Sequence, residues 1–182
     1  MIRRTLPLLL VALTGVAGCD RTTSLSITPE LDAQTSFASG LDGWVVDRSA
    51  GATSAAAVTA GEASEGSNYL RVDLTGGDDV IWVERVFTLQ PSSSYSVTIS
   101  ADLRAFSGSA DVRVFAGAVD PDGTGFASEG PAPGSWTRTL APRPFTTDAQ
   151  GRVWVAIGFA GTGQPGAFGI DDLGAAFLRT GS

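Results

Sequence analysis

Apolar and polar residues alternate along most of the chain from residue 33 onward. The clearest case is the segment from Tyr95 to Leu103, where odd-numbered residues are apolar and even-numbered residues are Ser, Thr or Asp. A period of two places alternate side chains on opposite faces of a β-strand, so this segment predicts a strand with one buried face. No stretch of useful length has the period of an amphipathic helix. The pattern therefore predicts an all-β protein.

The same alternation predicts the other strands. Two of them are around Val112–Ala116 and Val153–Phe159. The residues expected to face the core are Val112, Val114, Ala116, Val153, Val155, Ile157 and Phe159. Those expected to point outward are Arg113, Phe115, Arg152, Trp154 and Ala156. Further strands are predicted at 43–48, 54–60, 68–75, 79–89, 135–146 and 166–178. Short strands between turns rich in Gly, Pro and Asp are typical of a two-sheet antiparallel sandwich.

The segment 79–89 carries two apolar sets that compete for the core side. One set is Ile81, Val83, Phe87 and Leu89, and the other is Val80, Trp82 and Val86. Because Arg85 falls on the face of the first set, a twist or a β-bulge is expected in this strand.

The first 18 residues have a different pattern, with Arg3 and Arg4 followed by a short apolar run and small residues. This run is too short for a stable helix across about 30 Å of hydrocarbon. The sequence Val16-Ala17-Gly18-Cys19 resembles the lipobox of bacterial lipoproteins. The resemblance implies cleavage before Cys19, lipidation of Cys19, export, and anchoring to an envelope membrane, inner or outer. The alternative is an ordinary secretory signal with a chance cysteine.

The expected organisation is a signal peptide at 1–18, a lipidated N-terminus and flexible tether at 19–32, one domain at 33–179 and a tail at 180–182. Without residues 1–18 the chain keeps 10 basic and 19 acidic residues, a net charge of −9. Such a surface repels phosphates, so nucleic acid is excluded as an expected partner.

The chain contains no histidine, which removes the usual general base of serine and cysteine nucleophiles and the commonest zinc ligand. For an enzyme, only catalysis by carboxylates then remains. A glycosidase would need two carboxylates about 5 to 9 Å apart on one face. Glu84 and Asp102 are candidates, but no strand carries closely spaced acidic residues. We therefore predict a protein that is not an enzyme.

Several landmarks in order resemble bacterial carbohydrate-binding modules of the galactose-binding-like jelly-roll type, such as those that bind cellulose, xylan or glucan. They are Phe37 to Trp44, Asn68 to Val72, Leu89 to Val97, Trp136 with Phe145-Thr146-Thr147, and Phe168 to Leu173. The resemblance covers about residues 33–179 and implies a jelly-roll β-sandwich that binds a polysaccharide or another glycan.

The same resemblance implies a structural calcium ion held partly by the closing aspartate, Asp171. In the family a glutamate directly after the early phenylalanine is a second ligand, but this chain has Ala38 there. The expected cofactor is therefore either none or this one calcium ion. The alternative role for Asp171 is to cap the end of a strand or to pair with an arginine.

Exposed aromatic rings beside charged groups suit a sugar, whose C–H face packs on a ring while its hydroxyls need partners. The predicted binding residues are Trp82, Phe115 and Trp154 with Arg113 and Arg152, and Trp44 and Trp136 are expected to fill the core or its rim. Exposure of Trp154, Phe115 or Trp82 within one concave groove would favour glycan binding. Burial of all three between the sheets would favour the alternative, a structural or protein-interaction lipoprotein without a sugar ligand.

Overall fold

The computed structural model of the chain describes residues 31–181. These residues form strands and turns, with no helix among them. Within this range, no segment could cross a membrane as a long apolar helix. The predicted signal peptide, Cys19 and most of the predicted tether lie outside the described residues.

The strands are β1 (Leu31–Thr35), β2 (Val45–Arg48), β3 (Ala55–Ala60), β4 (Asn68–Leu74), β5 (Val80–Thr88), β6 (Ser94–Ser107), β7 (Ala110–Gly117), β8 (Ala127–Pro131), β9 (Thr137–Thr146), β10 (Arg152–Gly161) and β11 (Gly166–Gly181). All strands that the alternation predicts are present, and the two that it does not predict are β1 and β8. β1 overlaps the last two residues of the predicted tether.

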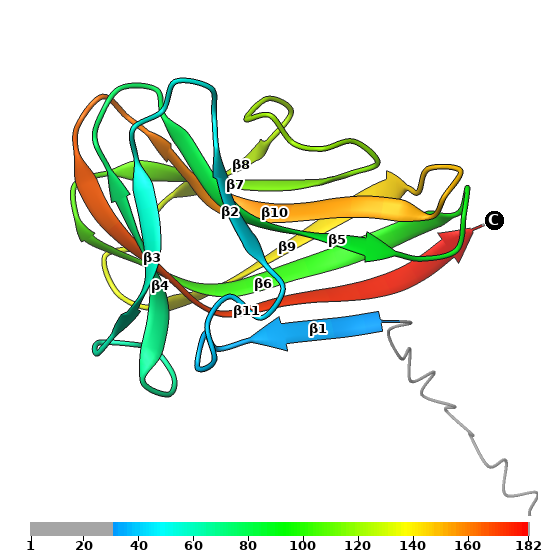
Figure 1. Cartoon of the computed structure of the whole chain (residues 1–182), viewed down its shortest axis with the longest axis horizontal. Coiled ribbons are helices and arrows are strands. Elements are labelled where there is room, and N and C mark those ends of the chain that lie inside the picture. Colours follow the sequence, from blue (N-terminus) through cyan, green and yellow to red (C-terminus); the bar gives the residue numbers. More distant parts are fainter. Residues whose placement is uncertain (1–30, 182) are drawn as a thin grey trace, which may run out of the picture.

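The strands form two antiparallel sheets packed face to face (Figure 1). Sheet A has the order β3-β4-β11-β6-β9, and sheet B has the order β2-β5-β10-β7-β8. β1 pairs with β11 from Leu173 to Phe177, beyond the point where β4 stops at Ile170. The predicted two-sheet antiparallel sandwich is confirmed.

The core lies between the sheets and consists of the residues that the alternation places inward. On β6 the inward residues from Tyr95 to Leu103 are at most 1% exposed, and on β10 those from Val153 to Phe159 are fully buried. Phe159 of sheet B stacks on Phe168 of sheet A, with ring centroids 4.9 Å apart. Each such side chain contributes roughly 1.5 to 3 kcal/mol through burial, so the sandwich is held by apolar packing.

In β5, Ile81, Val83 and Phe87 face the core, as one of the two competing apolar sets requires. Of the twist or β-bulge expected at Arg85, the bulge is absent, because β5 pairs with β10 from Val80 to Thr88 without a shift of register. Arg85 is instead accommodated at the rim, where its guanidinium lies 5.2 Å from the Phe87 ring and donates to the Asp42 carbonyl.

The connection between β7 and β8, residues 118–126, is called the cover loop here because it lies on the outer side of sheet B (Figure 1). Phe126 at its end packs against Trp82 of β5 and Phe115 of β7, with centroid distances of 5.2 and 5.4 Å. The cover loop therefore decides which part of the outer face of sheet B meets solvent.

Candidate functional site

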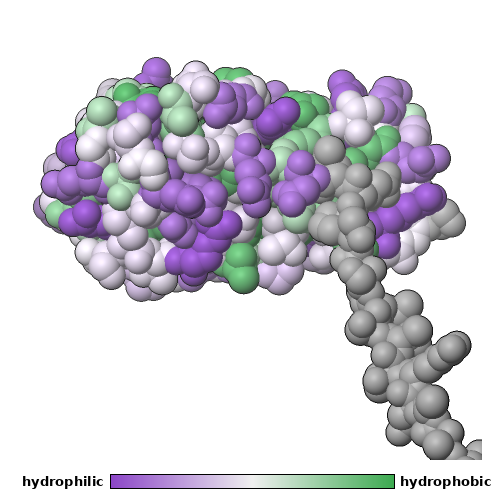
Figure 2. All heavy atoms as spheres, turned by 90° about the horizontal axis from the view of Figure 1, so that it is seen from below, coloured by the Kyte–Doolittle hydropathy of each residue, from purple (hydrophilic) through white to green (hydrophobic). Residues whose placement is uncertain are grey.

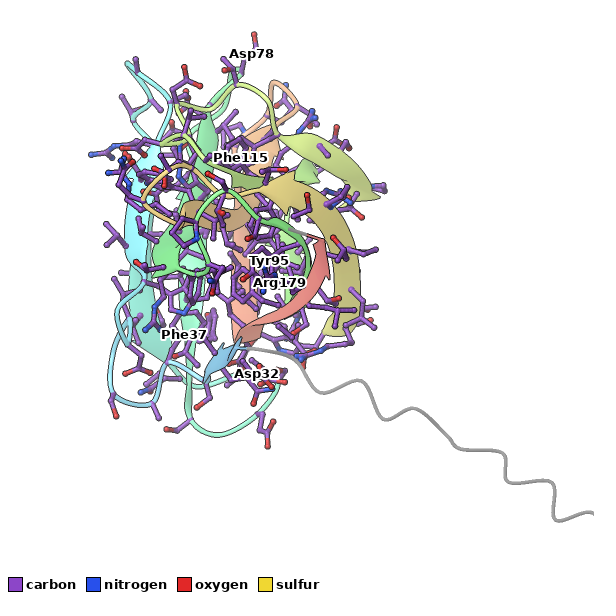
Figure 3. The ribbon with its side chains drawn as sticks, turned by 90° about the vertical axis from the view of Figure 1, so that its right-hand side faces the viewer. Asp32, Phe37, Asp78, Tyr95, Phe115 and Arg179 are labelled. Carbon is purple, nitrogen blue, oxygen red and sulfur yellow. The ribbon has the colours of Figure 1, made fainter. Side chains whose placement is uncertain are left out.

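The structure places all five predicted binding residues on the outer face of sheet B. Residues directly opposite each other on neighbouring strands share a face. Gly158 of β10 lies opposite both Trp82 and Arg113, and Phe115 lies opposite Ala156. Trp154 and Arg152 lie on the same face of β10, toward its other end. Figure 3 shows Phe115 on the opposite side of the molecule from Asp32 of β1. None of the three predicted rings lies between the sheets.

Trp82 is on the expected face but offers no ring surface to a ligand. It is 2% exposed, because Phe126 and Gly123 of the cover loop lie against it. Its indole Nε1 donates a 2.6 Å hydrogen bond to Glu84 Oε2. The alternation predicts the face correctly, but it contains no signal for the loop that covers the ring.

Phe115 and Arg113 line the partly covered end of the same face. Phe115 is half-buried beside Phe126, and Arg113 is paired with Asp111 at 3.3 Å. Arg113 and Phe126 contribute to a small cavity of about 290 Å³, which Asp78 and the glycines of the cover loop also line. This end has a polar lining and little exposed aromatic surface.

Trp154 lies where the outer face is open. It is half-buried, and the guanidinium of Arg152 lies 5.5 Å from its ring centroid. Val86, directly opposite on β5, is 46% exposed, and Val45 on β2 is 58% exposed opposite Glu84. These five residues form the open surface called the Trp154 strip.

The charged groups of the Trp154 strip are held in place. Asp148 accepts a 2.8 Å hydrogen bond from Arg152 Nε and holds this side chain at the Trp154 ring. Burial raises the pKa of Glu84, and the nearby carboxylates of Asp120 and Asp47 add to the rise, while the hydrogen bond from Trp82 opposes it. The strip therefore combines an aromatic ring and two valines with a fixed cation and a carboxylate, groups that can pack on a sugar ring and hydrogen-bond to hydroxyls.

Asp171 is fully buried at the irregular part of β11, and its oxygens are already used. Oδ2 accepts hydrogen bonds from the Ser64 amide, the Ser64 hydroxyl and the Glu65 amide at 2.8 to 3.0 Å, and Oδ1 accepts one from the Asp172 amide. Donor hydrogens directed at both oxygens repel a cation. Residues 31–181 contain no group of three or more acidic, His or Cys side chains placed for a metal. The residues around Asp171 thus do not fit a calcium ion and instead tie the 64–65 turn to β11.

The two carboxylates considered for catalysis lie on opposite faces of the molecule. Glu84 is on the outer face of sheet B, and Asp102 is on the outer face of sheet A, where it pairs with Arg138. They cannot act on one glycosidic bond.

Sequence reasoning missed an aromatic cluster on the outer face of sheet A. Trp136, expected in the core or at its rim, packs there against Tyr69 and Phe106. Phe106 is the next even-numbered, outward-facing residue of β6 after the polar ones. The alternation along β6 therefore already places an aromatic ring on the outer face of sheet A.

No protein-family model matches the chain, and no curated protein matches it in sequence. Solved structures do match its fold. The C-terminal family 22 carbohydrate-binding module of Xyn10B from Clostridium thermocellum aligns with 86% of this chain and 97% of its own, at TM-score 0.56 and 15% identity. The CBM22-1 xylan-binding domain of Xyn10C from Paenibacillus barcinonensis covers 81% and 94%, at TM-score 0.53 and 16% identity. CtCBM11 covers 87% and 98%, at TM-score 0.52 and 17% identity. This chain therefore has the jelly-roll sandwich fold of carbohydrate-binding modules.

Proposed function

We propose that the protein is a non-catalytic glycan-binding lipoprotein and that the Trp154 strip is its binding surface. The observation that carries the proposal is a half-buried tryptophan on the central strand of sheet B, at the open end of its outer face, with a fixed arginine beside it and a carboxylate in reach. The fold shared with carbohydrate-binding modules supports the same ligand class. The alternative, a structural or protein-interaction lipoprotein, would use the same exposed valines to contact another protein.

The proposal is tested by electrophoresis of the protein in native gels that contain xylan, galactan or mixed-linkage β-glucan. Wild type should be retarded by at least one of them. Trp154→Ala removes the ring that packs on the sugar and should weaken binding about tenfold or more, which corresponds to about 1.4 kcal/mol.

Leu140→Ala is the matched control, because Leu140 is 62% exposed on β9 of the other sheet. Its retardation should equal that of wild type. If no glycan retards the wild-type protein, or if both variants bind as it does, the Trp154 strip is not a glycan site and the protein-interaction alternative stands.

The proposed lipid anchor is supported by the lipobox alone. Metabolic labelling with a palmitate analogue should mark the wild-type protein and leave Cys19→Ser unmarked. Equal labelling of both would remove the anchor from the proposal and leave glycan binding unaffected.

A further inference from the structure

A hollow on the outer face of sheet A has aromatic and cationic walls. Tyr69, Phe106 and Trp136 contact one another with centroid distances of 5.3 to 5.9 Å. Trp136 and Phe106 lie over Gly169 of β11, where an added Cβ would come within 2.5 Å of the Trp136 ring. The absence of a side chain at residue 169 therefore allows the rings to lie directly on the sheet.

The hollow beside these rings has a volume of about 460 Å³. It is lined by Tyr69, Arg71, Arg104 and Phe106, and residues 60–62 form its rim. The rim is fixed to the sheet, because the Trp136 indole donates a 2.7 Å hydrogen bond to the Glu62 carbonyl. A volume of this size lies within the range of small-molecule sites.

The two arginines of the hollow differ in how firmly they are paired. Arg71 is held by both carboxylate oxygens of Asp73 at 3.0 and 3.1 Å, a bidentate contact that raises the pKa of Arg71. Arg104 stacks on Phe106 at 4.5 Å and reaches Glu62 only at 3.4 Å, longer than the 2.7–2.9 Å of a strong charge-assisted hydrogen bond. The Glu62 side chain is 69% exposed. A carboxylate from a ligand can therefore replace Glu62 on Arg104 at small cost.

We propose that this Arg104 hollow binds a sugar ring that carries a carboxylate, with the carboxylate on Arg104 and the ring against Phe106 and Tyr69. A guanidinium matches the two oxygens of a carboxylate, and the rings supply the apolar surface that a pyranose needs. Many residues at the left and centre of this side of the molecule are hydrophilic (Figure 2), which suits a saccharide better than an apolar protein partner. The site shares no residue with the Trp154 strip, so it stands or falls independently of the proposed function.

Isothermal titration of the full chain with oligogalacturonate and alginate oligosaccharides tests the proposal, with uncharged galactan oligosaccharides for comparison. The wild-type protein should bind an acidic oligosaccharide with an affinity that falls as salt is added. Arg104→Gln should weaken binding about tenfold or more, because it removes the charged partner of the carboxylate. Glu62→Gln should strengthen binding about two- to fivefold, because it removes the internal competitor.

Glu65→Gln is the matched control for Glu62→Gln, since it makes the same change of charge in the same turn and lies outside the lining of the hollow. Leu140→Ala is a second control, because Leu140 is exposed and lies outside the lining of the hollow, and it should leave the binding of acidic saccharides unaffected. The proposal is overturned if the wild-type protein binds no acidic oligosaccharide, if Glu65→Gln strengthens binding as much as Glu62→Gln, or if Arg104→Gln binds like wild type. Thermal unfolding of each variant separates loss of the site from loss of the fold.

Discussion

At the scale of single residues, the pKa of Glu84 on the outer face of sheet B predicts how the stability of the protein changes with pH. Burial raises its pKa above the ordinary value of 4.5, so the folded state favours the protonated carboxyl. The contribution of Glu84 to the free energy of unfolding is therefore most favourable below pH 4.5, and it falls as the pH rises through the folded-state pKa of this carboxyl. Glu84→Gln is neutral at every pH and keeps an oxygen that can accept from Trp82. We expect this variant to melt at a higher temperature than wild type at pH 7, with a difference that closes as the pH falls.

Asp79 supplies a comparison of opposite sign. A hydrogen bond from the Ser54 hydroxyl, with further hydrogen bonds from the Thr53 and Ser54 amides, lowers its pKa below 3.8. Its contribution to stability is present above that value and is lost as the pH falls through the folded-state pKa. Asp79→Asn should therefore melt below wild type at pH 7 and approach it in acid. If Glu84→Gln also melted below wild type at pH 7, the cause assigned to Glu84 would be wrong.

The sequence predicts the position of a side chain correctly where that position depends on one strand alone. Alternation along β10 is sufficient to place Trp154 and Arg152 on the outer face, and the paired strands supply their neighbours. For Trp82 the same alternation gives the face but not the exposure, because Phe126 lies 44 residues further along the chain and reaches the ring through the cover loop. The weak pairing of Arg104 with Glu62 depends on a distance, which no sequence pattern contains.

At the scale of elements, the pairing of β5 with β10 depends on a residue without a side chain. Gly158 lies opposite Trp82, and a Cβ at this position would come within 2.1 Å of the Ile81 carbonyl oxygen and 2.5 Å of the Trp82 Cα. Both are backbone atoms, so neither can move without separating the strands. Gly158→Ala should lower the free energy of unfolding by about 3 kcal/mol or more, measured by urea denaturation.

Gly134→Ala is the control for Gly158→Ala, because nothing lies within 4 Å of an added Cβ at Gly134 and its φ is not in the left-handed region. It should change stability by no more than about 0.5 kcal/mol. A Gly158→Ala protein as stable as this control would mean that sheet B is less tightly paired at its centre than the register indicates.

The two elements that alternation does not predict share a physical cause. β8 contains Gly130 and Pro131, and all of its residues are exposed or half-buried at the edge of sheet B. β1 has only five residues and is positioned by its partner β11, which is free to accept it where β4 ends. Strands of this kind are defined by an edge elsewhere in the chain. The sequence of β8 has no period of two, and the alternation in β1 spans only five residues, too few to predict a strand.

At the scale of the whole molecule, the two candidate sites lie on opposite outer faces of one shared core. Trp136 reports on the outer face of sheet A and Trp154 on that of sheet B, while Phe159 and Phe168 join the sheets in the interior. Because each sheet buries its inner face only against the other, neither should persist alone. Fluorine NMR of protein labelled with fluorotryptophan should therefore give the same urea midpoint for both reporters.

Phe168→Ala leaves a cavity at the contact between the sheets, and it should lower stability by about 3 to 5 kcal/mol. Since Phe168 belongs to sheet A, a loss confined to that sheet would move the Trp136 midpoint and leave that of Trp154 in place. A shared core instead requires both midpoints to move together, whereas Leu140→Ala on the surface should move neither. Separate midpoints would mean that the faces unfold independently, and each candidate site would then depend on the integrity of its own sheet alone.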